Sequence, residues 1–203
     1  MSDPRTHWET LYAEKAPDQV SWYQAAPTLS LTLLSHAKLR PGSIAVDLGS
    51  GASPMVGALL AKDLMVTAVD ISASALEAAK LALGDKAGEV EWVVADACEW
   101  RPNQVFDLWH DRAVFHFMTT PELRAGYLKA LKAGLKPGGL IIMATFALDG
   151  PEQCSGLAVQ RYDADTLVKA LGPGFTLVEQ AMEHHRTPKG SKQKFNYFLI
   201  RRG

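Results

Sequence analysis

The chain has 203 residues, of which 47% are hydrophobic and 21% charged, so it can bury a substantial core without metals or disulfides. Its formal net charge is −1, which excludes a global attraction to nucleic acid or to an anionic membrane. Only two cysteines, Cys98 and Cys154, are present, so no disulfide framework is indicated.

The first residues lack the apolar core of a signal peptide, and no segment approaches the ~18 continuous apolar residues that span a bilayer. We therefore expect a cytoplasmic protein without a membrane partner. The His and Cys residues lack the paired spacing of a zinc motif, so we expect no metal site.

Residues 1–40 are expected to form a helical extension that packs on the core. Its aromatic residues, Trp8, Tyr12, Trp22 and Tyr23, are interrupted by prolines. Helices are predicted from Thr6 or His7 to Tyr12, and from Thr28 to about Ala37.

From residue 41 to 203 the pattern predicts one domain in which apolar strand-like runs alternate with helical runs. This alternation is typical of right-handed βαβ units and a parallel sheet. The predicted strands are 44–48, 65–69, 90–95, 106–110 and 140–146, and the predicted helices are 55–62, 73–83, 121–135 and 164–171.

The end of the domain departs from this alternation. The run 140–146 is apolar almost throughout, as expected of a strand buried on both faces at the centre of a parallel sheet. A loop over 149–162 follows, and two later strand-like runs, 175–183 and 194–201, flank a turn at 187–191. These two runs predict an antiparallel hairpin at the edge of the sheet.

A glycine-containing turn, Ile44–Ser53, joins the first strand to the first helix of the domain. Gly49 and Gly51 let a ligand approach the backbone closely, and the following helix offers unpaired N–H groups. Asp47 precedes the loop, where it either contacts a ligand or braces the loop by hydrogen bonds. A strand–glycine–helix turn predicts a nucleotide-type ligand in an open α/β sheet.

Two acidic residues indicate which ligand this turn serves. Asp70, followed by Ile71, ends the second strand about twenty residues after Asp47, the spacing of an acid that binds ribose hydroxyls. Asp96 and Ala97 end the third strand, where the acid could reach an adenine amino group. The loop lacks the third glycine of a pyrophosphate-binding Gly-x-Gly-x-x-Gly motif, which favours S-adenosylmethionine over NAD. Asp70 could otherwise be a helix cap, and Asp96 a solvated strand end.

Four motifs make the chain resemble the class I S-adenosylmethionine-dependent methyltransferases from about Trp8 to its end. They are Val46-Asp-Leu-Gly-Ser-Gly-Ala-Ser53, Val69-Asp-Ile-Ser72, Val94-Ala-Asp-Ala97 and Leu135-Lys-Pro-Gly-Gly139. Ser53 departs from the pattern, because many members have a third glycine there. The resemblance implies a Rossmann-like three-layer α/β sandwich with sheet order 3-2-1-4-5-7-6 and an antiparallel seventh strand.

The reacting methyl group is expected near the end of the fourth strand, at the switch point of strand order. Charged groups crowd into that apolar stretch as His110, Asp111, Arg112 and His116. Burying such groups is costly unless they pair or act. They form either an internal network that holds the loop or part of the acceptor pocket, with His or Asp as general base.

Two further segments are candidates for covering the site. His184 and His185 are adjacent on a predicted strand, so only one of them can face the site. Trp22 or Tyr23 could face a sulfonium in a lid that orders when the cofactor binds, or could simply cover the sheet. We expect catalytic roles for Asp111, His116 and His185. The expected cofactor-binding residues are Trp22, Asp47, Gly49, Ser50, Gly51, Asp70, Ile71, Asp96, Ala97 and His110.

The predicted function is direct methyl transfer to a small-molecule nucleophile, for which a small thiol or sulfide is one choice. A protein lysine methyltransferase is the main alternative, with Asp149, Glu152 and Tyr162 available for the lysine tail. The second alternative is a cofactor-binding protein without catalytic activity. A nucleic-acid methyltransferase is not expected, because the chain lacks a basic stripe and an Asn/Asp-Pro-Pro-Tyr-like motif.

Overall fold

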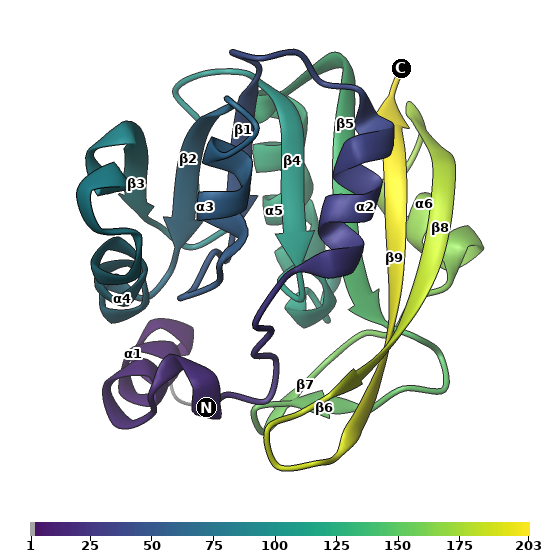
Figure 1. The fold of residues 1–203 in the computed structure, drawn as a ribbon. Helices are drawn as coiled ribbons and strands as arrows, with labels where there is room; N and C mark the ends of the chain where they lie inside the picture. The colour runs from purple at the N-terminus through teal and green to yellow at the C-terminus, as the bar shows by residue number, and fades with distance from the viewer. Residues whose placement is uncertain (1–2) are drawn as a thin grey trace.

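A computed structural model describes residues 3–203, and the first two residues of the predicted extension lie outside the described part. Seven strands form one sheet in the order β3-β2-β1-β4-β5-β9-β8, and β6 and β7 form a separate two-stranded ribbon (Figure 1). The strands are β1 Ile44–Leu48, β2 Met65–Asp70, β3 Val90–Val94, β4 Phe106–Arg112, β5 Leu135–Phe146, β6 Gln153–Cys154, β7 Leu157–Ala158, β8 Phe175–Arg186 and β9 Lys192–Arg202.

The pairing confirms the predicted topology. Strands β1 to β5 are parallel where they pair, and β9 runs antiparallel to both β5 and β8. The helices are α1 Pro4–Glu14, α2 Thr28–Ala37, α3 Met55–Leu60, α4 Ala73–Leu83, α5 Pro121–Gly134 and α6 Ala164–Leu171, with 3-10 turns η1 Pro17–Gln19, η2 Gly84–Glu89 and η3 Phe115–Phe117.

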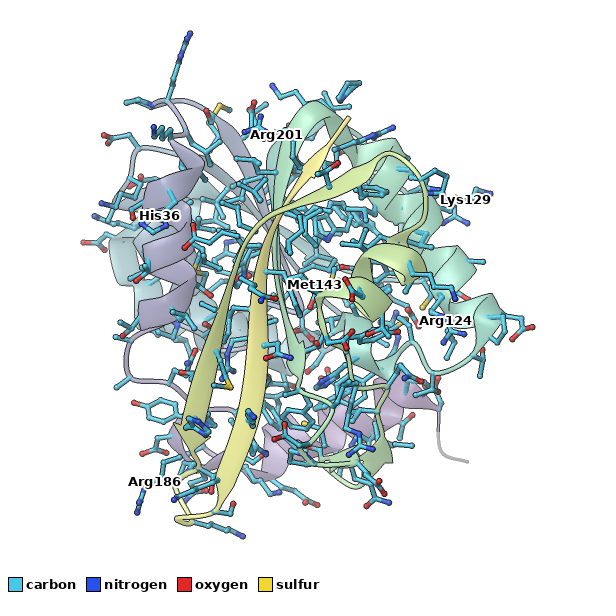
Figure 2. All side chains as sticks on the ribbon, turned by 90° about the vertical axis from the view of Figure 1, so that its right-hand side faces the viewer. His36, Arg124, Lys129, Met143, Arg186 and Arg201 are labelled. Carbon is cyan, nitrogen blue, oxygen red and sulfur yellow. The ribbon has the colours of Figure 1, made fainter. Side chains whose placement is uncertain are left out.

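The sheet separates two apolar clusters, as expected of a three-layer α/β domain. One cluster unites α2, α3 and α4 with the sheet through residues such as Leu33, Met55 and Leu76. The other unites α5 and α6 with the opposite face through residues such as Tyr127 and Leu167. Figure 2 looks onto the β8–β9 edge, with His36 of α2 on one side and Lys129 of α5 on the other. Helix α2 is thus part of the core layer.

Helix α1 lies beyond the carboxyl ends of the strands, next to α4 (Figure 1). Its Glu9 accepts hydrogen bonds from the Ser72 hydroxyl and from the Ser74 backbone N–H. A carboxylate at a helix N-terminus is stabilised by the unpaired N–H groups there, so Glu9 fixes α1 to the start of α4. The N-terminal segment therefore lies at the edge of the sheet where ligands of this fold class bind.

Some element bounds differ from the prediction. Strand β5 starts at Leu135, five residues before the predicted strand 140–146, and its pairing with β4 shifts in register between Phe106 and Leu108. Strand β4 extends to Arg112, two residues beyond its predicted end. The β6–β7 ribbon was not predicted, because two-residue strands show no periodicity. No helix within residues 3–203 is long and apolar enough to cross a membrane.

Candidate functional site

The glycine loop leaves β1 in backbone conformations that favour glycine. Gly49 and Gly51 have φ angles of +64° and +51°. The N–H groups of Gly49 and Ser50 both donate to the Val69 carbonyl at 2.7 and 3.1 Å, which ties the loop to the end of β2. A methyl group added at Gly49 would overlap the Val114 side chain, and one added at Gly51 would overlap the Tyr12 hydroxyl. The sequence forms this loop because only glycine tolerates both the φ angle and the close neighbour.

Asp70 at the end of β2 is bonded to the glycine loop. One carboxylate oxygen accepts from Gly51 N at 2.8 Å and the other from Ser72 N at 2.9 Å. Burial raises the pKa of Asp70 to about 6, although these backbone hydrogen bonds oppose the increase. Ile71 follows, partly buried. The carboxylate thus braces the loop while it stands where a ribose-binding acid is expected.

Tyr12 of α1 closes this part of the site from the other side. Burial, with the nearby charge of Asp70 as a second cause, raises the pKa of the Tyr12 hydroxyl well above its usual value. Tyr12 therefore stays neutral and covers Gly51.

Asp96 and Ala97 follow the end of β3 and are both partly exposed. Asp96 accepts a hydrogen bond from Cys98 N at 2.8 Å through one carboxylate oxygen. It caps the turn after the strand, as an aspartate commonly does. Its position beyond β3 remains compatible with a second contact to a purine.

A buried chain of hydrogen bonds joins the N-terminal region to the end of β1. His110 lies opposite Asp47 in the β1–β4 register, and its Nδ1 is 2.6 Å from Asp47 Oδ1. Its Nε2 is 2.9 Å from the hydroxyl of Ser30 on α2. Both ring nitrogens of His110 are therefore engaged. The pair holds Asp47 in one orientation and leaves Asp47 Oδ2 buried without a partner among residues 3–203.

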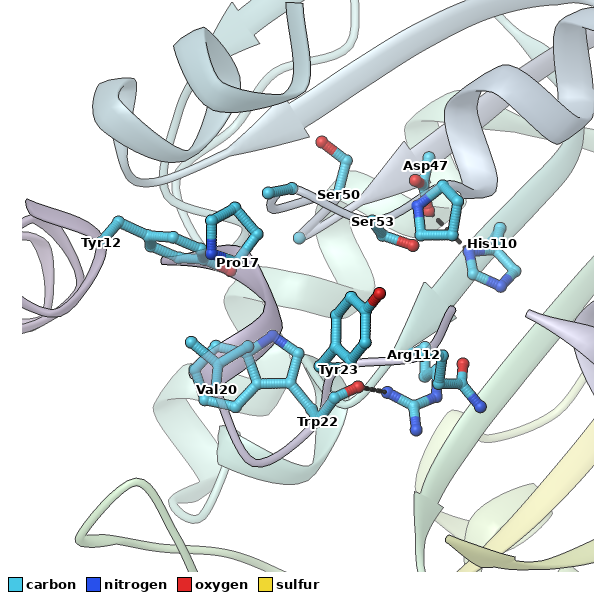
Figure 3. Close-up of a pocket in the computed structure, with 14 residues that line it drawn as sticks. Tyr12, Pro17, Val20, Trp22, Tyr23, Asp47, Ser50, Ser53, His110 and Arg112 are labelled. Carbon is cyan, nitrogen blue, oxygen red and sulfur yellow. Dashed lines mark hydrogen bonds and ion pairs between the residues drawn. The ribbon is translucent and has the colours of Figure 1, made fainter. Parts of the chain in front are cut away.

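A cavity that is partly open to solvent separates the glycine loop from residues 17–24. Figure 3 shows Pro17, Val20, Trp22 and Tyr23 on one side and Asp47, Ser50 and Ser53 on the other. His110 and Arg112 of β4 lie at the same end of the cavity in this view. The complete lining is Tyr12, Pro17, Val20, Trp22, Tyr23, Gln24, Asp47, Gly49, Ser50, Ala52, Ser53, Pro54, His110 and Arg112.

Three hydrogen bonds fasten the N-terminal segment over this cavity. Arg112 donates through Nη1 to the Trp22 carbonyl at 2.9 Å, as Figure 3 shows. His185 donates through Nε2 to the Ser21 carbonyl at 2.8 Å, and Gln24 donates to Glu183 at 2.7 Å. A carbonyl can only accept, so the Nε2 of His185 carries the proton. Trp22 itself is half-buried, with its ring edge-on to Trp8 and Tyr12.

His185 is consequently not placed as the catalytic base that the sequence suggested. It is buried, it lies outside the cavity lining, and its Nε2 is engaged with Ser21. Burial also lowers the pKa of its imidazole. The neighbouring His184 is exposed on the opposite face of β8, as strand alternation requires.

Asp111, which we expected to be catalytic, points to the opposite face of β4 from the cavity. Its carboxylate accepts from Val114 N at 2.9 Å, from Phe115 N at 3.0 Å and from the Tyr127 hydroxyl of α5 at 2.5 Å. These bonds hold the turn after β4, in which Ala113 has a φ of +72°. Asp111 is fully buried and lies outside the cavity lining, so its role is to brace this strained turn.

His116 cannot act as a base near neutral pH. Its ring is fully buried, and burial together with the charge of Arg112 lowers its pKa to about 3. The ring packs against Phe117 and Phe146, with centroid separations of 4.5 and 5.0 Å. Neither ring nitrogen has a hydrogen-bond partner among residues 3–203. The burial and the low pKa of His116 therefore disfavour the general-base role that we expected for it.

Sequence reasoning missed the residues that reach the site from distant segments. These residues form hydrogen bonds with partners far away in the chain, which no local sequence motif predicts. They are Gln24, Ser30, Glu183 and Tyr197. Arg112 could be noticed in the sequence as a charged residue in an apolar stretch, where a charge is expected to have a partner. It donates through Nε to the Tyr197 hydroxyl at 2.8 Å, besides its bond to Trp22.

These features fit S-adenosylmethionine. Two buried polar atoms at the cavity, Asp47 Oδ2 and Ser50 Oγ, have no partner among the described residues and could receive donors of the amino-acid end. The backbone of Gly49 and Ser50 lines the same cavity, next to these two atoms. Asp70 ends β2 and Asp96 follows the adjacent strand β3, where we expected acids for the ribose and the adenine.

Comparisons with known proteins find methyltransferases. A family model described as a methyltransferase domain matches residues 45–139. The chain is 29% identical over 184 residues to thiocyanate methyltransferase 1 of Arabidopsis thaliana, covering 89% of this chain and 78% of that protein. It is 33% identical over 129 residues to thiocyanate methyltransferase 1 of Brassica oleracea, covering 63% of this chain and 57% of that protein.

Solved structures share the fold. The 1,6-didemethyltoxoflavin-N1-methyltransferase of Burkholderia thailandensis, which contains S-adenosylhomocysteine, superposes with a TM-score of 0.75 at 21% identity over 100% of this chain and 91% of that chain. The N-methyltransferase NodS of Bradyrhizobium japonicum, also with S-adenosylhomocysteine, gives 0.73 at 16% identity over 96% and 97%. With the four motifs, the sheet order and the cavity, these matches lead to one conclusion: the chain belongs to the class I S-adenosylmethionine-dependent methyltransferases, and S-adenosylmethionine is its cofactor.

Proposed function

We propose that this methyltransferase acts on a small, soft nucleophile of the sulfur type that is already ionised when it binds. The observation that carries the proposal is that each imidazole considered as a base is unavailable. His110 is engaged at both nitrogens, His116 has a pKa of about 3, and His185 is bonded to a backbone carbonyl outside the cavity. Without such a base, a neutral phenol or ammonium acceptor would keep its proton, whereas a thiolate or thiocyanate has none to lose.

The enclosure of the site supports a small acceptor. Residues 17–24 cover the cavity and are tied down by Arg112, His185 and Glu183. Two relatives described above are named thiocyanate methyltransferases, and thiocyanate is a small, permanently ionised sulfur nucleophile. The proposal extends that chemistry to this chain.

When bound, S-adenosylmethionine supplies an electrophilic methyl carbon on a sulfonium centre, which an acceptor lone pair attacks in line. The residues of the chain provide position and a dry environment. Asp47 and the glycine loop bind one end of the cofactor, and Asp70 and Asp96 bind the nucleoside end. Trp22, Tyr23 and Arg112 line the cavity and exclude water, which helps to align the two reactants.

The contacts of the loop after β5 disfavour the lysine methyltransferase alternative. Asp149 forms an ion pair with Lys194 at 2.7 Å, and Glu152 pairs with Arg161 at 3.2 Å. Tyr162 is buried. None of these three residues lines the cavity, so they offer no acidic or aromatic groove for a lysine tail at its mouth.

A methyl-transfer screen tests the proposal. Purified protein with labelled S-adenosylmethionine is offered thiocyanate, hydrosulfide, aromatic thiols, phenols, amines and a proteome extract. We expect methylation of thiocyanate and thiols. With no protein base, kcat/KM for each thiol should rise with pH until the thiol itself is ionised, and kcat/KM for thiocyanate should stay flat between about pH 7 and 9.

The variant Gly49→Val, which cannot adopt the loop without overlapping Val114, serves as the control without bound cofactor. Label that enters only protein would contradict a small acceptor. A pH profile shared by all acceptors, whatever their own pKa, would contradict the absence of a protein base. No transfer to any acceptor would favour a non-catalytic cofactor-binding protein.

We further propose that residues 15–25 act as a lid. Residues 15–19 are exposed, and the hydrogen bonds that fasten the following residues to Arg112, His185 and Glu183 can break without disturbing the sheet. Opening this segment would let cofactor and acceptor enter.

Limited trypsin digestion checks the lid. Cleavage after Lys15 should slow at least several-fold when S-adenosylhomocysteine is added, because the segment then gains contacts with the ligand. Cleavage after Lys86, which is exposed in the η2 turn between α4 and β3, is the internal control and should not change. Equal rates at Lys15 with and without ligand would contradict the lid.

A further inference from the structure

Arg112 and His116 carry three buried nitrogens that have no hydrogen-bond partner among residues 3–203. They are Nη2 of Arg112 and both ring nitrogens of His116. Leaving a buried polar group without a partner costs stability, by about 1–3 kcal/mol for a neutral group and more for a charged one. A ligand that accepts hydrogen bonds from both side chains would remove this cost.

Several contacts place the two side chains in one neighbourhood. The guanidinium of Arg112 lies 4.6 Å from the centre of the Phe195 ring, and Phe195 contacts Phe146 with centroids 4.6 Å apart. Phe146 in turn contacts the His116 ring at 5.0 Å. The charge of Arg112 is near enough to lower the pKa of His116. Arg112 also lines the cavity beside His110 (Figure 3), whereas His116 is fully buried and is not part of the cavity lining.

We propose that Arg112 Nη2 and the imidazole N–H of His116 form a subsite for a small monovalent anion, which is the ionised acceptor. This inference rests on the proposed function, and it names the residues that would select a negatively charged acceptor. Because His116 remains neutral, it has one N–H to donate, and the guanidinium adds charge-assisted donors.

The surroundings favour a soft anion over a strongly hydrated one. Glu183 balances Arg112 only in part: it is 3.6 Å from Nη2, and its two oxygens already accept from Gln24 and Tyr197. The other neighbours are aromatic rings, Phe117, Phe146 and Phe195. An anion that enters such a site loses its hydration shell, which costs least for a large, polarisable ion.

The variant His116→Phe tests the subsite without endangering the fold. A phenyl ring suits the aromatic surroundings and removes the two unpartnered nitrogens, so we expect an unchanged or higher Tm. The KM for thiocyanate should rise about ten- to a hundred-fold, as expected for the loss of a hydrogen bond to a charged group. Affinity for S-adenosylhomocysteine, measured by calorimetry, should stay within about two-fold. The variant Arg112→Lys retains the positive charge but loses the planar, forked arrangement of guanidinium N–H donors, so it should also raise the KM for thiocyanate.

Thr145→Val is the matched control. Thr145 is fully buried, its hydroxyl lacks a partner among the described residues, and its neighbours Ala144 and Phe146 belong to the cluster on the cavity side of the sheet. By strand alternation its side chain points to the opposite face. This variant also removes an unpartnered buried group, yet it should leave the KM for thiocyanate unchanged.

Thiocyanate binding to the complex with S-adenosylhomocysteine separates this subsite from the proposed function. Binding to the wild type that is lost in His116→Phe supports the subsite, even if the wild type transfers no methyl group to the anion. Methylation of thiocyanate with equal KM in wild type and His116→Phe overturns the subsite and leaves the proposed function standing. Absence of thiocyanate binding to the wild type also overturns it.

Discussion

Replacing Asp70 by alanine should weaken the binding of S-adenosylhomocysteine at least a hundred-fold. The substitution leaves two backbone donors, Gly51 N and Ser72 N, without their carboxylate partner and removes the group proposed to bind the ribose. Hydrogen bonds to a charged group contribute about 1.5–3 kcal/mol each, so losing those donated by the two ribose hydroxyls reaches this range. Calorimetric titration measures the change directly.

Asp70→Asn is the conservative comparison, because its amide oxygen can still accept one of the two N–H groups. It should fall between wild type and alanine. Asp85→Ala, which removes an exposed carboxyl outside the site, controls for the change in net charge. Wild-type affinity in Asp70→Ala would contradict both the loop-bracing and the ribose assignment.

The affinity should also depend on pH through Asp70. In the free protein its pKa is raised to about 6, so a fraction of the carboxyl is protonated below that pH. Ribose hydroxyls donate to the ionised form, and binding therefore releases a proton below about pH 6. We expect affinity to rise as the pH goes from 5 to 7 and to level off above. Asp70→Asn should lose the part of this slope that arises from Asp70.

Replacing Asp111 by alanine should destabilise the protein by about 3–5 kcal/mol, the usual cost of removing one partner from a buried charged network. Val114 N, Phe115 N and the Tyr127 hydroxyl would all lose their acceptor, and the turn containing Ala113 would lose its brace. For a chain of this size, Tm falls by about 2–4 °C per kcal/mol, so a loss of about 10 °C is expected. Urea and thermal unfolding followed by circular dichroism measure both quantities.

The pH dependence separates the carboxylate from its hydrogen bonds. The pKa of Asp111 is raised to about 6 in the folded state, above an unfolded value of about 3.9. The folded protein thus holds this proton more tightly, and the corresponding stability is lost as the pH rises from about 4 to 6. Asp111→Asn lacks this loss, so its stability relative to wild type should improve over that interval. An unchanged Tm in Asp111→Ala with abolished turnover would instead restore Asp111 as a catalytic residue.

The cofactor half of the site was accessible from the sequence because it is local. The glycine loop and Asp70 both occupy a strand end and the turn that follows, and a strand–turn–helix segment positions its own residues over a few positions. Periodicity and turn chemistry act over the same range, so they also located the main helices and the alternation that sets the sheet order.

The direction of the side chains at the end of β4 could not be predicted from the sequence in the same way. Asp111 and its two neighbours looked equivalent as charges in an apolar run. In the sheet, His110 and Arg112 face α2 and the cavity, while Asp111 faces α5. The strand also extends two residues further than predicted, and the strand end decides which residues alternate and which enter the turn.

The fold class, the cofactor and the acids at the ends of β2 and β3 could be predicted from the chain alone, because these depend on short-range patterns. The arrangement of the proposed acceptor end emerged only from the three-dimensional structure. Ser30, Trp22, Arg112, Glu183 and Tyr197 come from segments far apart in the chain, and they meet through sheet pairing and helix packing. Burial then sets the properties that matter for chemistry, since it makes His116 a neutral donor in place of a base.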